Sequence, residues 1–106
     1  MKKIVGISSC PVGIAHTYMT AQALENIGRK NDLTVKIERQ GQLGPENVIT
    51  DQEFAEADGI VIACGVEPIG AERWADYADK TVEIDYDKAL KKPQIMIDAL
   101  KEKGLI

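Results

Sequence analysis

The chain has 106 residues, a length typical of one domain, and 44% of them are hydrophobic, so it can bury a core without disulfide bonds. Its 17 Asp and Glu residues outnumber its 13 Lys and Arg residues and no basic cluster stands out, which argues against a nucleic-acid-binding protein. It has two cysteines and no Cys-x-x-Cys pair, which argues against a structural zinc site.

The first apolar stretch, "KIVGIS" at residues 3–8, is nearly continuous, which is typical of a central strand covered on both faces. A secretion signal needs an apolar region of about 7–15 residues, and Ser8 and Ser9 interrupt this one too early. No run approaches the roughly 20 apolar residues of a membrane span. We therefore expect a soluble protein that begins with a strand.

A helix is predicted after this strand, over residues 14–30. Its core face consists of small side chains at intervals of three or four residues: Thr17, Ala21, Leu24 and Gly28. The next segment, "LTVKIE" at residues 33–38, alternates apolar and polar residues. One face of this strand, which includes Glu38, is therefore expected in solvent, at an edge of the sheet.

The middle of the chain is expected to contain a loop, a helix and a strand. Glycine and proline in "RQGQLGPEN" at residues 39–47 indicate a loop. Thr50 and Glu53, three positions apart, are typical of a capping box that begins a helix. "GIVIA" at residues 59–63 is continuously apolar, which predicts a second central strand.

The last part of the chain is expected to hold an edge strand and a helix. "KTVEID" at residues 80–85 alternates apolar and polar residues, as the earlier edge strand does. A helix is predicted to begin near Pro93, a favoured first-turn residue, and to end at Gly104. Its buried stripe is Met96, Ile97 and Leu100.

Strands that alternate with helices predict an α/β fold, a three-layer sandwich in which helices cover both faces of a four-stranded parallel sheet. Numbered in chain order, the strands are expected in the spatial order 2-1-3-4, within a single domain at residues 1–106. The order reverses between strands one and three, and ligands of open α/β sheets bind beyond the carboxyl ends of strands at such a point. Cys10 and Cys64 follow these two strands, so both thiols are expected at this crevice.

The strongest chemical signal is the segment "CPVGIAHT", which starts at Cys10. This cysteine precedes a predicted helix N-terminus, where about four backbone N–H groups lack partners and the helix dipole adds positive charge. Both effects favour a thiolate, and the same groups suit a phosphate. Gly13 permits a tight loop, and Pro11 stiffens its start. Thr17 and His16 can donate hydrogen bonds to the sulfur or to a bound oxyanion.

A packing role is the alternative for each of these residues alone, since an isolated cysteine after a strand is usually a small buried hydrophobe. A nucleophile, a glycine turn, a helix N-terminus and two polar side chains in one octet are hard to explain as packing. Cys64 is expected to be only the last residue of a buried strand. We do not expect it to come within the Cα separation of about 7 Å that a disulfide with Cys10 would need.

The segment resembles the active-site loop of the fructose-type enzyme IIB components of the bacterial phosphoenolpyruvate-dependent sugar phosphotransferase system, whose usual run is C-P-T-G-I-A-H-T. The chain has "CPVGIAHTYMTAQAL" there, with Val12 in place of Thr. A second signature of the family, V-E-T-Q-G-S-x-G, is similar to "IERQGQLG", with Arg39 in place of Thr. Further on, "ACGVEPIGAERW" keeps the arginine and an aromatic of the family, Arg73 and Trp74, but has Gly65 in place of an acidic residue.

This resemblance, which covers most of the chain, implies phosphocysteine chemistry. Cys10 would accept a phosphoryl group from a phosphohistidine of an enzyme IIA and pass it to a fructose-like sugar bound by a membrane enzyme IIC. His16 and Thr17 would assist both transfers. The implied phosphate-binding loop is Pro11, Val12, Gly13, Ile14 and Ala15. No metal or cofactor is implied, and the expected location is the cytoplasm, at the inner face of the cell membrane through the partner.

Four other positions are candidates for partner docking because of their closeness to these motifs: Tyr18, Gln40, Gly41 and Arg73. Arg73 could steer the donor phosphate or form a surface ion pair, and the ion pair is favoured. For the loop that contains Gln40 and Gly41, the alternative to a docking role is a turn with no function in binding.

A low-molecular-weight cysteine-dependent phosphatase is the main alternative function. Such enzymes use the pattern C-x5-R-[ST], and here five residues separate Cys10 from His16, which is followed by Thr17. The pair Glu67-Pro68 could also imitate their acid–proline pair. The histidine in place of the phosphate-clamping arginine favours the carrier. A flavin-binding module and a thiol-redox protein fit less well, because aromatic residues are few and no resolving cysteine is near in sequence.

Overall fold

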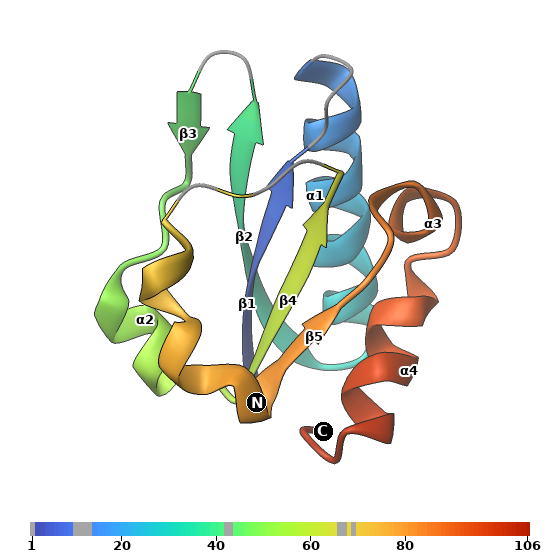
Figure 1. The fold of residues 1–106 in the computed structure, drawn as a ribbon. Coiled ribbons are helices and arrows are strands. Elements are labelled where there is room, and N and C mark those ends of the chain that lie inside the picture. The colour runs from blue at the N-terminus through green and yellow to red at the C-terminus, as the bar shows by residue number, and fades with distance from the viewer. Residues whose placement is uncertain (1, 10–13, 42–43, 66–67, 69) are drawn as a thin grey trace.

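One five-stranded sheet forms the middle layer of the protein in a computed structural model, with the strand order β3-β2-β1-β4-β5 (Figure 1). The structure describes residues 2–9, 14–41, 44–65, 68 and 70–106, and for residues 14–17, 41, 44 and 45 it describes the backbone alone. The strands are β1 (Lys2–Ser9), β2 (Leu33–Gly41), β3 (Gly44–Glu46), β4 (Gly59–Cys64) and β5 (Thr81–Glu83).

Four strands run parallel and confirm the predicted order. In chain order, β1, β2, β4 and β5 correspond to predicted strands one to four, and they lie in the spatial order β2-β1-β4-β5, which is the predicted 2-1-3-4. β1 pairs with β2 along its whole length and with β4 from Ile4 to Ser9. Because all three run in the same direction, Ser9 lies in register with Gln40 of β2 and with Cys64 of β4. The carboxyl ends of these strands therefore meet at one edge, away from the two chain ends (Figure 1).

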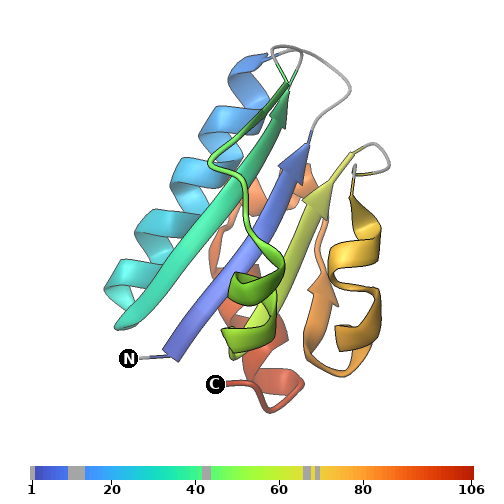
Figure 2. The same cartoon turned by 90° about the vertical axis from the view of Figure 1, so that its left-hand side faces the viewer.

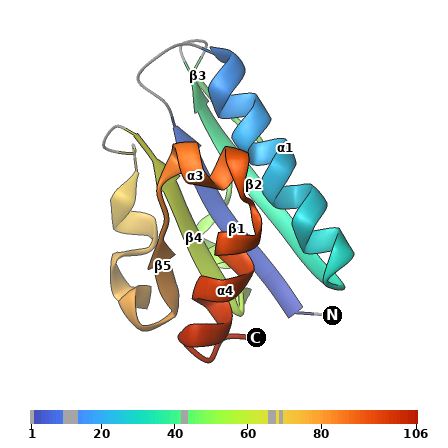
Figure 3. The ribbon, with the colours of Figure 1, turned by 90° about the vertical axis from the view of Figure 1, so that its right-hand side faces the viewer.

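Helices cover both faces of the sheet, which confirms the predicted three layers (Figures 2 and 3). α1 (Ile14–Lys30), α3 (Tyr86–Lys91) and α4 (Gln94–Glu102) lie on one face. α2 (Asp51–Glu56) and the 3₁₀ segments η1 (Ala71–Arg73) and η2 (Ala75–Lys80) lie on the other. Each face has its own apolar core, in which Leu24 and Leu100 are buried on the α1 side and Phe54 and Trp74 on the α2 side.

The predicted helix signals are confirmed. α1 begins and ends at the predicted residues. At α2, the Glu53 amide donates to Thr50 Oγ1 at 3.2 Å and the Thr50 amide donates to Glu53 Oε1 at 3.1 Å, so the capping box is complete. α4 follows Pro93 and buries the predicted stripe of Met96, Ile97 and Leu100, and Gly104 behind it has a positive φ of 78°.

The segment at residues 39–47 differs from the predicted loop. β2 continues to Gly41, and β3 pairs with it in antiparallel fashion from Arg39↔Glu46 to Gly41↔Gly44. Asn47 leaves this hairpin with a positive φ of 58°, and its side-chain amide donates to the carbonyl of Ile37 at 3.1 Å. Glycine and proline hid the hairpin because they are rare in strands, whereas here they occupy a short edge strand, where proline is tolerated.

Helix α1 packs against β2 through Gly28, which is buried. A Cβ atom at this position would lie 2.1 Å from Cγ2 of Val35, a distance that no packed pair of carbons tolerates. The absence of a side chain thus lets the helix lie close to the strand, and this contact helps to fix the helix whose N-terminus borders the carboxyl edge.

We predict that Gly28→Ala has opposite effects in two backgrounds. In the wild type the collision with Val35 costs about 1–3 kcal/mol and outweighs the helix-propensity gain of about 1 kcal/mol, so the free energy of unfolding falls. In the Val35→Ala background the collision is largely removed, so the same substitution stabilises the protein. Urea unfolding of the four proteins of this cycle measures the coupling, and equal effects in both backgrounds would contradict the packing argument.

Candidate functional site

The candidate site is the carboxyl edge of the sheet where β1, β2 and β4 end. β1 ends at Ser9 and α1 begins at Ile14, so four residues join the central strand to the helix. The chain crosses from β1 to β2 through α1 on one face and enters β4 through α2 on the other. The carboxyl ends of β1 and β4 therefore form the topological switch point at which open α/β sheets bind ligands.

Four predicted site residues directly follow β1 in the sequence and lie outside the described residues: Cys10, Pro11, Val12 and Gly13. The backbone of the next four residues, Ile14, Ala15, His16 and Thr17, forms the first turn of α1, as predicted, and their side chains are outside the description. The first amides of a helix have no intrahelical acceptors. The described part of the site thus supplies backbone donors and the positive end of a 17-residue helix.

The ends of β1 and β4 are joined beside this helix start. The Gly65 amide donates to the carbonyl of Ser9 at 2.8 Å, and the Cys64 thiol donates to the carbonyl of Ile7 at 3.7 Å. Burial is the main cause that raises the pKa of the Cys64 thiol; hydrogen bonds with Ser9 oppose it, and the charges of Glu83 and Glu38 add to it. Cys64 is thus the end of a buried strand, as predicted, and is a poor nucleophile. Its distance from Cys10 lies outside the described part of the chain.

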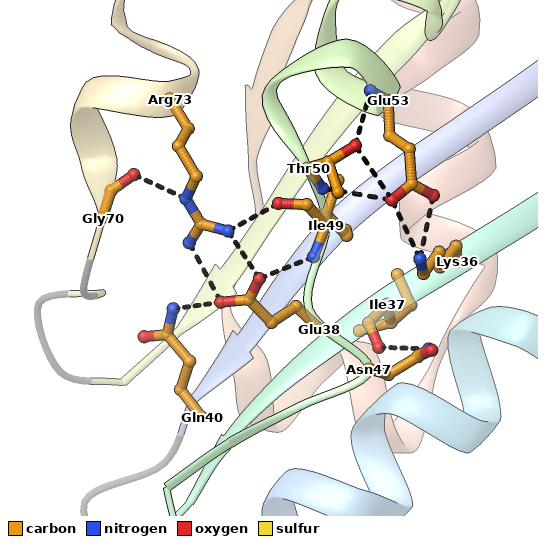
Figure 4. A network of polar contacts seen from close by, with 10 residues as sticks. All are labelled: Lys36, Ile37, Glu38, Gln40, Asn47, Ile49, Thr50, Glu53, Gly70 and Arg73. Carbon is orange, nitrogen blue, oxygen red and sulfur yellow. Dashed lines mark hydrogen bonds and ion pairs between the residues drawn. The ribbon is translucent and has the colours of Figure 1, made fainter.

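A buried carboxylate, Glu38, lies at the same edge, although alternation predicted its side chain in solvent. Its side chain is 1% exposed, because the layer of α2 and η1 covers this end of β2 (Figure 4). Arg73 Nη1 and Nη2 donate to its two oxygens at 2.6 and 3.0 Å. Gln40 Nε2 donates at 2.7 Å and the Ile49 amide at 2.9 Å.

These donors decide the protonation state of Glu38. Burial alone raises the pKa of this carboxyl, but the hydrogen bonds from Arg73, Gln40 and the Ile49 amide, with the positive charge of Arg73, outweigh burial and lower it. Glu38 is therefore ionised at neutral pH. Sequence reasoning missed this group, although the quoted motif "IERQGQLG" contains it.

Arg73 is held by Glu38, by two backbone carbonyls and by two aromatic rings. It also donates to the carbonyl of Ile49 at 2.8 Å and, through Nε, to the carbonyl of Gly70 at 3.0 Å. Its Cζ lies 5.5 Å from the ring centroids of both Phe54 and Trp74. The ion pair expected of Arg73 thus exists, but with a buried partner and a guanidinium side chain only 16% exposed, not at the surface. A docking role for Arg73 remains a prediction.

A second polar group joins α1 to the hairpin of β2 and β3. The Tyr18 hydroxyl donates to the carboxylate of Glu46, which is the main cause that raises the pKa of Tyr18. The guanidinium of Arg39 lies 5.5 Å from the Tyr18 ring centroid and 3.5 Å from a carboxylate oxygen of Glu25. The arginine that departs from the family signature thus bridges helix and strand.

The structure brings the candidate docking residues together unevenly. Tyr18 is partly exposed, whereas the Gln40 side chain is buried within the Glu38 network and Gly41 is the last residue of β2.

Over the described ranges, none of the helices combines the length and the apolar character needed to cross a membrane.

Comparison with known proteins gives consistent matches. A family model described as "PTS system, Lactose/Cellobiose specific IIB subunit" matches residues 5–103. The chain is 44% identical over 89 residues to the fructose-like PTS system EIIBC component of Escherichia coli K12, which covers 84% of the chain and 18% of that protein. It is 38% identical over 99 residues to the fructose-specific EIIABC component of Mycoplasma pneumoniae, which covers 93% of the chain and 14% of that protein. The chain therefore spans less than a fifth of the length of either relative.

A solved structure matches over nearly its whole length. It is the solution structure of the enzyme IIB subunit of the PTS system from Escherichia coli K12, with a TM-score of 0.86 and 38% sequence identity. The match covers 95% of this chain and 92% of that one.

We predict that Glu38→Gln lowers the free energy of unfolding by about 3 kcal/mol or more, because it leaves Arg73 without its buried partner. The wild-type contribution is complete above the ordinary carboxyl value of 4.5 and is lost as the pH falls through the lowered pKa of Glu38, so the difference between the two proteins shrinks in acid. Asp87→Asn is the control, because its pair with Lys91 is exposed and its loss changes stability by only about 0.5 kcal/mol. Chemical denaturation between neutral and acid pH measures both, and equal effects of the two substitutions would contradict the prediction.

Proposed function

The chain belongs to the enzyme IIB family of the bacterial sugar phosphotransferase system, and we propose that it carries a phosphoryl group on Cys10 during the uptake of a fructose-like sugar. One observation carries the proposal. β1 ends at Ser9, directly before this cysteine, at the topological switch point of the sheet, and a long helix begins at Ile14, four residues after Cys10. A thiolate in that position is favoured, and the helix amides suit the phosphoryl oxygens.

The proposed reaction has two half-reactions with phosphocysteine between them. In the first, the Cys10 thiol loses its proton and the thiolate attacks the phosphorus of a phosphohistidine on enzyme IIA; the P–S bond forms, the P–N bond breaks, and the leaving imidazole takes up one proton from solvent, which balances the proton that the thiol released. In the second, a sugar hydroxyl attacks; the P–O bond forms, the P–S bond breaks and the hydroxyl proton is released. Such transfers depend mainly on positioning and on stabilisation of charge.

The residues of the loop have separate roles in this proposal. The proposed phosphate-binding loop consists of Pro11, Val12, Gly13, Ile14 and Ala15. The equatorial oxygens are bound by the backbone amides of this loop, except at the proline, and by those of the first turn of α1. The Thr17 hydroxyl donates to the same oxygens or to the sulfur. His16 donates to a phosphate oxygen and favours the thiolate. The helix end supplies the positive potential, so the proposal needs no metal and no cofactor.

The proposed partners are an enzyme IIA donor and a membrane enzyme IIC that binds the sugar. Two relatives support these partners, because their names, EIIBC and EIIABC, indicate that B and C components, or A, B and C components, are parts of one protein. Residues 1–106 then act as one enzyme IIB domain, in the cytoplasm and beside the membrane through the partner. Tyr18, Arg73 and the end of β2 at Gln40 and Gly41 are proposed as part of the docking surface.

The phosphatase alternative is not favoured. The comparisons match enzyme IIB components, and both arginines near the carboxyl edge in the described residues, Arg39 and Arg73, are engaged by carboxylates. Glu67, the candidate acid of that alternative, lies outside the description.

We predict that Cys10→Ser abolishes phosphoryl acceptance without unfolding the protein. Phosphorylated enzyme IIA carrying ³²P is mixed with the wild type, with Cys10→Ser and with Cys64→Ser, and the label on each protein is measured. Cys64→Ser is the matched control and should be labelled as the wild type is, because Cys64 is half-buried and the pKa of its thiol is raised.

Two results would contradict the carrier function. One is label that still enters Cys10→Ser. The other is steady hydrolysis of an aryl phosphate that the wild type performs and Cys10→Ser does not, which would favour the phosphatase.

We predict that His16→Ala slows labelling of Cys10 by about tenfold or more without eliminating it, because the backbone donors of the helix end remain. Rapid quenching of the transfer from enzyme IIA gives the rate. A rate equal to that of the wild type would limit His16 to a structural role.

A further inference from the structure

Glu38 is a buried, ionised group that the proposed transfer does not use. Removing a carboxylate from water is costly, and buried ion pairs are often replaced by apolar side chains with no loss of stability. Stability alone therefore does not explain a carboxylate that is 1% exposed. Its place in the fold offers another explanation.

The Glu38 network lies beside the end of the central strand. Glu38 is in register with Ile7 of β1, and Gln40, whose amide donates to Glu38, is in register with Ser9. The network joins three segments that border the carboxyl edge: the end of β2, the connection at Ile49, and the stretch from Gly70 to Arg73 (Figure 4). The residue that follows Ser9 is Cys10, the proposed phosphoryl carrier.

A negative charge in this place acts against the proposed chemistry. An unpaired carboxylate raises the pKa of a nearby thiol and repels an incoming phosphoryl group, which carries up to about two negative charges. The effect reaches the end of β4, because burial first, and the charges of Glu83 and Glu38 in addition, raise the pKa of the Cys64 thiol. The bidentate contact of Arg73, at 2.6 and 3.0 Å, places a positive charge against Glu38 and offsets part of its negative charge.

We propose that Arg73 is a positioning residue for phosphoryl transfer, which neutralises Glu38 and, through Glu38, holds the Gln40 amide beside the end of β1. This inference rests on the proposed function of Cys10. Arg73 is suited to the task because two backbone carbonyls and the rings of Phe54 and Trp74 hold its guanidinium in one place.

Loss of Arg73 makes the site sensitive to pH. Arg73 is the charged side chain that acts on Glu38; Glu72 of η1 and Asp51 of α2 act in turn on Arg73, and Glu83 of β5 acts together with Glu38 on Cys64 of β4. Burial raises the pKa of Glu38, and without Arg73 two of the causes that oppose burial are lost, so this pKa rises. Below that raised pKa Glu38 is neutral; above it, Glu38 carries an uncompensated charge, and both native stability and thiolate formation at Cys10 decline.

The experiment compares four proteins in a Cys64→Ser background, so that Cys10 is the only thiol. They are the parent, Arg73→Met, Arg73→Lys and the double variant Glu38→Gln/Arg73→Met. The rate of alkylation of Cys10 by iodoacetamide is followed against pH to give its thiol pKa. The rate of ³²P transfer from phosphorylated enzyme IIA is measured over the same range, and circular dichroism checks the fold.

In Arg73→Met we expect the Cys10 pKa to rise by about one pH unit and transfer to fall about tenfold at alkaline pH, the size expected of one uncompensated charge within about 10 Å at an effective dielectric constant of about 20. The deficit should shrink as the pH falls through the raised pKa of Glu38. Arg73→Lys, which keeps the charge, and the double variant, which removes both charges, should have a Cys10 pKa close to that of the parent.

Two results would overturn the inference. One is a Cys10 pKa and a transfer rate in folded Arg73→Met that match those of the parent. The other is an equal, pH-independent deficit in Arg73→Met and in the double variant, which would mean that Arg73 acts through structure alone. If Arg73→Met does not fold, Arg73→Lys and the double variant decide: both must keep the parental Cys10 pKa. A parent that alkylates normally but accepts no phosphate would refute the proposed function of Cys10, while the alkylation profiles still test the effect of Arg73.

Discussion

The parallel pairing of β1 with both β2 and β4 is the constraint on which the site depends. It places Ser9, Gln40 and Cys64 side by side, and it leaves the chain no short way to continue except through a crossover helix. Because α1 follows the end of β1 after four residues, its N-terminus borders the same edge as the strand ends, and because the crossovers on the two sides of β1 lie on opposite faces, this edge is a switch point. A nucleophile directly after β1 thus meets backbone donors as a consequence of topology.

Patterns set by short-range physics could be read from the sequence. Continuous apolar runs identified the two central strands, since only a strand covered on both faces excludes polar residues throughout. The spacing of Ala21, Leu24 and Gly28 indicated the core face of α1. The pair of Thr50 and Glu53 indicated the start of α2, because a capping box is complete within four residues. The position of Cys10 before a helix was predictable for the same reason.

Features that depend on a third layer could not be read in this way. Alternation placed Glu38 on a solvated face, but η1 and α2, from distant parts of the sequence, cover that end of β2 and bring Arg73 to it. Two partners of Glu38, the Ile49 amide and Arg73, are 11 and 35 residues away, so no local pattern contains them. The hairpin at β3 was missed because Gly44 and Pro45 are typical of loops, and its pairing is settled by β2.

Among the described residues, two arginines border the carboxyl edge, and their pairing with carboxylates fits the proposed carrier better than a hydrolase. Arg39 is engaged by Glu25 and the Tyr18 ring, and Arg73 by Glu38 and two carbonyls. A free guanidinium would clamp a phosphoryl group in two places and hold it until water attacks. A helix end binds the same oxygens with weaker, uncharged donors. A carrier must accept a phosphoryl group and release it to the next acceptor, and the weaker hold of a helix end suits this task because the guanidinium groups of Arg39 and Arg73 are paired with carboxylates.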